Sequence, residues 1–106
     1  MDSYTPCRTT ELYRIDGEFI TIMSVHGEIT LTGAKCKIWI LSDGKHTIQE
    51  ITNQVLGFYG NQKSNIVRAE VIDTLLFLQE RSLVVTNWDP LYKQELQQLA
   101  RKQPLR

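Results

Sequence analysis

Three short segments in the first third of the chain have the apolar and polar patterns of β-strands. Apolar and polar residues alternate in the third segment, whereas the second is rich in β-branched and aromatic residues and has apolar residues on both faces. We expect these strands over residues 11–15, 19–25 and 28–32. Asp16-Gly17 and His26-Gly27 separate the segments, and glycine in such pairs permits the backbone angles of tight hairpin turns. The sequence therefore predicts a three-stranded antiparallel sheet whose third strand is an edge with unpaired backbone groups.

Apolar positions recur at helical spacing through the middle of the chain. We expect helices over residues 33–41, 48–59 and 66–81. Asp43-Gly44 ends the first helix, because glycine adopts the left-handed conformation found at helix C-termini. Thr47 and Glu50 have the spacing of a capping box, which predicts the start of the second helix at residue 48.

The third predicted helix carries two apolar stripes. The first stripe consists of Val67, Val71, Leu75 and Leu78. Ile72 and Leu76 form a second stripe beside it, at the same helical spacing. One stripe should pack against the other helices, so the second requires a partner, and we expect the edge strand to supply it. A short strand over residues 83–85 then closes the domain.

The two ends of the chain differ from this central part. Residues 1–9 are polar, and we expect a flexible N-terminus there. Asp89-Pro90 is a typical helix start, and it predicts a final helix over residues 91–101. The sequence thus divides into residues 1–9, a domain over residues 10–87 and a C-terminal helical extension over residues 88–106. The fold class is α+β, with the element order of a winged helix-turn-helix domain.

Composition limits the classes of function. The 106 residues include twelve basic and twelve acidic side chains, and a nucleic-acid binder of this size usually has a basic excess. No apolar run approaches the roughly 20 residues of a membrane span, and no signal peptide is visible, so we expect a cytoplasmic protein without a membrane partner. Cys7 and Cys36 do not make a disulfide framework.

We find no catalytic constellation in the sequence. His26 and His46 lie in predicted turns, and neither has a cysteine or histidine at a metal-ligand spacing. Ser42, Asp43 and His46 lie within five residues, whereas triad members usually come from distant segments. Trp39 fits a core aromatic residue of the first helix. We therefore predict a protein that is not an enzyme and that holds no metal or cofactor.

The ordered motifs resemble the PqqD-like family, whose members are recognition elements for ribosomally made precursor peptides. The motifs are Leu31, Thr32-Gly33, Ile38-Trp39, Leu41-Ser42-Asp43-Gly44, Thr47-Ile48-Gln49-Glu50-Ile51 and the apolar run from Leu75 to Leu83. The resemblance covers residues 10–85. It implies a non-enzymatic chaperone that binds the leader segment of a precursor peptide. It also implies delivery of that peptide to a modifying enzyme, such as a radical SAM enzyme, a leader peptidase or a cyclase.

The resemblance further implies that the leader pairs with the third strand and lies against the third helix. On the strand, the predicted peptide-binding residues are Glu28, Ile29, Thr30, Leu31 and Thr32. On the helix, they are Arg68, Ile72, Leu76 and Gln79. Strand addition draws affinity from backbone hydrogen bonds and specificity from pockets for alternate side chains. Ile29 and Leu31 are equally compatible with plain core packing.

Two alternatives remain open. A winged-helix regulator of DNA is one, although the predicted second helix has no lysine or arginine to reach base edges. A protein-interaction module is the other, and it includes a homodimer formed by pairing of edge strands. The apolar stripe of the final helix, formed by Tyr92, Leu96 and Leu99, could also dock a partner.

Overall fold

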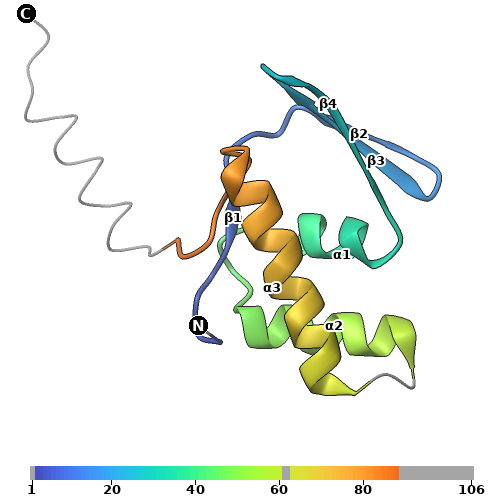
Figure 1. Ribbon diagram of the computed structural model, residues 1–106, viewed down its shortest axis with the longest axis vertical. Helices are drawn as coiled ribbons and strands as arrows, with labels where there is room; N and C mark the ends of the chain where they lie inside the picture. Colours follow the sequence, from blue (N-terminus) through green and yellow to red (C-terminus); the bar gives the residue numbers. More distant parts are fainter. Residues whose placement is uncertain (1, 61–62, 89–106) are drawn as a thin grey trace, which may run out of the picture.

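The structure is a computed structural model, and it describes residues 2–60 and 63–88 of the chain. The elements are β1 (Cys7–Arg8), β2 (Tyr13–Asp16), β3 (Phe19–Ser24), β4 (Gly27–Thr32), α1 (Ala34–Leu41), α2 (Ile48–Tyr59), α3 (Ser64–Glu80) and β5 (Val84–Val85). The sheet of β2, β3 and β4 lies at one end of the molecule, and the three helices pack together beside it (Figure 1). The predicted α+β architecture, with a three-stranded antiparallel sheet and three helices, is confirmed.

The three-stranded sheet has β3 in its centre and two edges, β2 and β4. Its register pairs Ile20 with Leu31 and Ile22 with Ile29, so apolar side chains gather on one face. Ile20, Ile22 and Leu31 are buried there. The prediction that the third strand is an edge is therefore confirmed. The observed bounds of the three strands differ from the predicted bounds by at most two residues.

The hydrophobic core lies where this face of the sheet meets the helices. Trp39 of α1 is fully buried, and its ring meets that of Tyr13 edge to face, with centroids 5.5 Å apart. Edge-to-face contact suits two aromatic quadrupoles and adds to the burial of their surface. The core prediction for Trp39 is thus confirmed, and the contact joins α1 to β2.

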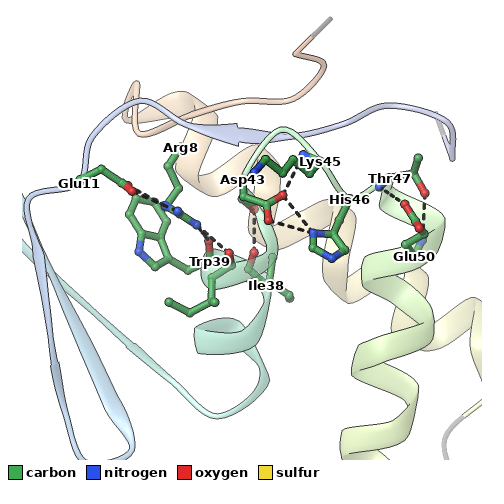
Figure 2. A network of polar contacts seen from close by, with 11 residues as sticks. Arg8, Glu11, Ile38, Trp39, Asp43, Lys45, His46, Thr47 and Glu50 are labelled. Carbon is green, nitrogen blue, oxygen red and sulfur yellow. Dashed lines mark hydrogen bonds and ion pairs between the residues drawn. The ribbon is translucent and has the colours of Figure 1, made fainter. Parts of the chain in front are cut away.

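The start of α2 follows the predicted capping box atom by atom. The Thr47 hydroxyl accepts from the Glu50 N–H at 3.1 Å, and the Glu50 carboxylate accepts from the Thr47 N–H at 2.8 Å (Figure 2). Two N–H groups that lack partners inside the helix are satisfied in this way. The observed bounds of α2 equal the predicted ones.

One face of α3 is buried as its first stripe predicts. Val67, Val71, Leu75 and Leu78 are all buried, together with Thr74. The second stripe divides, because Ile72 is partly buried against the core whereas Leu76 is exposed. The helix begins at Ser64, two residues before the predicted start.

The N-terminal segment is not the loose tail that the sequence predicts for residues 1–9. Its β1 strand pairs with β5, and Pro6 is fully buried. The N–H of Ile48, at the start of α2, donates to the Tyr4 carbonyl at 2.8 Å. β5 and Ile48 lie 40 or more positions further along the chain than the residues they contact. The polar composition of residues 1–9 therefore could not indicate these contacts. The predicted helix over residues 91–101 lies outside the described residues.

Arg8 fastens this segment to the end of α1. Its guanidinium donates to the carbonyls of Trp39, at 2.9 Å, and of Ile40, at 2.7 Å (Figure 2). The same group lies 5.8 Å from the centroid of the Trp39 ring and forms an ion pair with Glu11. The last turn of α1 has no basic residue of its own, so Arg8 supplies the positive charge that a helix C-terminus favours.

We expect Arg8→Ala to lower the free energy of unfolding by roughly 2–3 kcal/mol, because charged hydrogen bonds to two carbonyls are lost. Urea unfolding measures the change. Glu11→Ala is the matched control, since it removes only the ion pair to a carboxylate that is 72% exposed. It should cost less than about 0.5 kcal/mol. Equal losses in the two variants would contradict the anchoring role of the carbonyl contacts.

Candidate functional site

Among residues 2–60 and 63–88, β4 has no strand neighbour on the side away from β3, and this open edge is the first part of the candidate site. The N–H of Met23 donates to the Leu12 carbonyl on the β2 side of β3, at 2.9 Å. On β4, Glu28 lies opposite Met23. The Met23–Glu28 pair therefore shares no backbone hydrogen bonds. Backbone groups alternate in direction along a strand, so every second residue of β4 faces away from β3. The N–H and C=O groups that face the open edge belong to Glu28, Thr30 and Thr32.

A groove of about 660 Å³ lies between this edge and α3. Its strand side consists of Thr30, Leu31 and Thr32, and Lys35 of α1 lies at its rim. The helix side consists of Ile66, Ala69, Glu70, Asp73, Thr74 and Phe77. The groove thus joins unpaired strand backbone to a wall of mixed side chains.

The wall of α3 combines apolar and acidic groups. Ile66 and Phe77 are exposed apolar residues, and Glu70 and Asp73 lie between them along the helix. The Tyr59 hydroxyl donates to Glu70 at 2.8 Å, which joins α2 to this wall. This arrangement offers hydrogen bonds along one side and contacts for alternate side chains along the other, as an extended peptide requires.

The structure places the five predicted strand residues on two faces of β4. Thr30, Leu31 and Thr32 line the groove. Leu31 is also buried in the core, and Ile29 packs against it, so the core interpretation holds for both residues. The Glu28 side chain is exposed.

The four predicted helix residues lie on another face of α3, and none of them lines the groove. Arg68 forms an ion pair with Asp2 of the N-terminal segment. Ile72 packs against the core, and the side chains of Leu76 and Gln79 are exposed. These four residues flank the core stripe of α3 on one side, whereas Ile66 and Phe77 flank it on the side of the groove, so the predicted helix wall stays a prediction that the groove does not include.

The spacing of apolar residues in the sequence could have indicated the helix side of this groove. Ile66, Asp73 and Phe77 follow one another at spacings of seven and four, which places them on one face of a helix. The acidic residues within this face made it resemble a solvated surface. Two large apolar residues that the core cannot reach were the informative feature.

The turn between α1 and α2 holds Ser42, Asp43 and His46. The Ser42 hydroxyl donates to the Ile38 carbonyl at 2.7 Å, and Ser42 is fully buried. Asp43 accepts from the Lys45 N–H at 2.8 Å and contacts His46 Nδ1 at 3.0 Å (Figure 2). The serine and the histidine are thus engaged with different groups, and the contacts stabilise the turn.

The described part of the chain contains neither a candidate metal site nor a helix that could span a membrane. Among residues 2–60 and 63–88, no cluster of three or more histidine, cysteine, aspartate or glutamate side chains could hold a metal ion. No helix in the same residues has the length and apolar character to cross a membrane.

Comparison of the chain with protein-family models, with curated proteins and with solved structures finds no match. The likeness to PqqD-like proteins therefore depends on the sequence motifs alone.

Asp43 yields a prediction on pH. Burial raises the pKa of Asp43, but hydrogen bonds from His46 and the Lys45 N–H outweigh it, so the pKa lies below its ordinary 3.8. The carboxylate therefore stabilises the fold above about pH 3.8, and this contribution disappears as the pH falls through the lower, folded-state pKa. Asp43→Asn should cost about 1 kcal/mol near pH 6 and progressively less below pH 4.

Urea unfolding from pH 2.5 to pH 6 measures this difference. His46→Ala should remove part of the same stability near pH 6, and the double variant should lose less than the sum of the two single losses. A loss for Asp43→Asn that stays constant down to pH 2.5 would contradict the assignment.

Proposed function

We propose that the protein binds an extended peptide by strand addition to β4, with alternate side chains of the peptide in the groove against α3. The open edge of β4 beside this groove is the observation that carries the proposal. The peptide is the leader segment of a ribosomally made precursor, and the protein acts without catalysis of its own. It presents the leader to a peptide-modifying enzyme in the cytoplasm.

The backbone geometry supports the proposal first. Glu28, Thr30 and Thr32 direct their N–H and C=O groups to the open edge, which supplies up to six hydrogen bonds for an added strand. The Thr30 and Thr32 side chains are exposed, so a peptide can approach without displacing core residues. Such bonds give affinity with little dependence on peptide sequence.

The wall of α3 supports it second. Exposed Ile66 and Phe77 offer apolar contacts to a peptide side chain, and burial of apolar surface contributes roughly 25 cal/mol per Å². Specificity would then come from the side chains of α3. The element order also suits the winged helix-turn-helix arrangement of PqqD-like proteins, which we keep as part of the proposal.

Calorimetry with leader segments of precursor peptides encoded beside the gene tests the proposal directly. Binding of one leader at micromolar concentration or tighter would support it. If no leader binds and the protein instead retards duplex DNA at moderate salt, the winged-helix regulator replaces it. If neither ligand binds, strand addition to β4 has no role in recognition by this protein.

Substitution of Thr30 tests the backbone contribution. Proline removes an N–H that faces the open edge, and proline is tolerated on edge strands at such positions. We therefore expect Thr30→Pro to remain folded while its affinity for the leader falls at least about tenfold, or about 1.4 kcal/mol. Thr30→Val changes the side chain but keeps the N–H, and it should bind like the wild type. Equal affinities in all three proteins would argue against strand addition.

A second pair of variants identifies the helix wall. Phe77 and Leu76 are neighbours on α3 with similar exposed fractions, 39% and 41%, but only Phe77 lines the groove. Phe77→Ser should weaken leader binding about tenfold, because it removes an apolar contact inside the groove. Leu76→Ser should leave binding unchanged, because Leu76 does not line the groove. Calorimetry on both variants measures the difference. The reverse result would restore the wall that the sequence predicted.

A further inference from the structure

The second edge of the sheet, β2, presents backbone groups of its own. The Met23 N–H donates to the Leu12 carbonyl, so Leu12 faces β3. By alternation Arg14 and Asp16 also face β3, and the N–H and C=O of Ile15 point to the open edge. In the part of the chain that the structure describes, no strand pairs with this edge.

An exposed apolar side chain lies at the centre of β2. Ile15 is 61% exposed, although it follows Tyr13 on the face of the sheet that covers the core. It lines the rim of an apolar groove of about 490 Å³ together with the exposed side chains of Ile40 and Phe58. Apolar residues gathered at a free strand edge are typical of a surface that another chain covers.

Opposite charges flank Ile15 on the other face of the sheet. Arg14 and Asp16 are about half exposed and contact each other, with Nε and Oδ2 2.6 Å apart. If two β2 strands paired antiparallel about a two-fold axis at Ile15, position 14 of each chain would lie opposite position 16 of the other. Each arginine would then lie opposite an aspartate of the second chain, so the edge is complementary in charge to a copy of itself.

We propose that β2 pairs antiparallel with β2 of a second copy of this chain, centred on Ile15. Ile15 and the partner's Ile15 exchange two backbone hydrogen bonds, and their side chains lie together on the core side. Arg14 lies opposite the partner's Asp16 in a pair without backbone bonds, where side chains approach most closely. The two sheets become one six-stranded sheet.

This inference goes beyond the proposed peptide binding, because it uses the opposite edge of the sheet. Each copy keeps β4 at the outside of the joined sheet, so both grooves remain accessible. The pairing involves a strand of only four residues in each copy and is small for a specific interface. We therefore expect the dimer to dissociate on dilution.

Charge exchange provides the test, with sedimentation velocity over a series of protein concentrations. The wild type should show a concentration-dependent dimer. Arg14→Asp and Asp16→Arg each place like charges opposite one another, and each should weaken the dimer at least tenfold. An equimolar mixture of the two variants restores both opposite-charge pairs and should form heterodimers. The doubly exchanged variant should dimerise like the wild type.

Glu28→Arg, a charge reversal on the β4 edge, is the matched control and should leave the dimer unchanged. A wild type that stays monomeric at all concentrations would overturn the proposal. Dimers that survive both single variants, or that only Glu28→Arg weakens, would also overturn it, as would a mixture without heterodimers.

A measurement on the wild type alone tests the pairing even if the variants do not fold. Hydrogen exchange of the Ile15 amide should slow as the protein concentration rises, because that N–H gains a partner only in the dimer. An exchange rate that is independent of concentration would overturn the β2 pairing even if another dimer forms.

Discussion

The guanidinium of Arg8 is the interaction on which the arrangement of the domain depends. It lies where β1, the end of α1 and the sheet meet, with contacts to the carbonyls of Trp39 and Ile40 and to the Tyr13 ring. Trp39 fills the core directly beneath it. One partly buried cation therefore joins β1 and β2 to the end of α1. It does so through carbonyls of the last turn of the helix, of which that of Trp39 also accepts from the Ser42 N–H at 3.2 Å.

The packing of the helices against one face of the sheet leaves both of its edges available in the described residues. The helices cover one face of the sheet through Ile20, Ile22 and Leu31 and leave β2 and β4 without strand neighbours in the described residues. Gly33, with φ of 61°, turns the chain from β4 directly into α1. The strand edge that we propose for peptide binding and the edge that we propose for self-association thus lie on opposite sides of β3.

Local sequence patterns predicted most of the elements, because their causes are local. Strand composition and the Asp16-Gly17 and His26-Gly27 turns predicted the sheet, and the spacing of Thr47 and Glu50 predicted the first residue of α2. The residues of the groove wall were harder to predict from the sequence. Periodicity shows which residues of α3 share a face, but not which neighbouring element that face meets. The pairing of β1 with β5 depends on two-residue strands separated by most of the chain, and no local pattern indicates it.

That pairing also determines where the chain enters and leaves the domain. The Trp88 N–H donates to the Thr5 carbonyl at 2.7 Å, and the Thr5 N–H donates to the Asn87 side chain. The first and last described segments therefore run side by side. A domain with this geometry can be grafted into a surface loop of another protein, or be permuted to new termini, without separating the strands that close it.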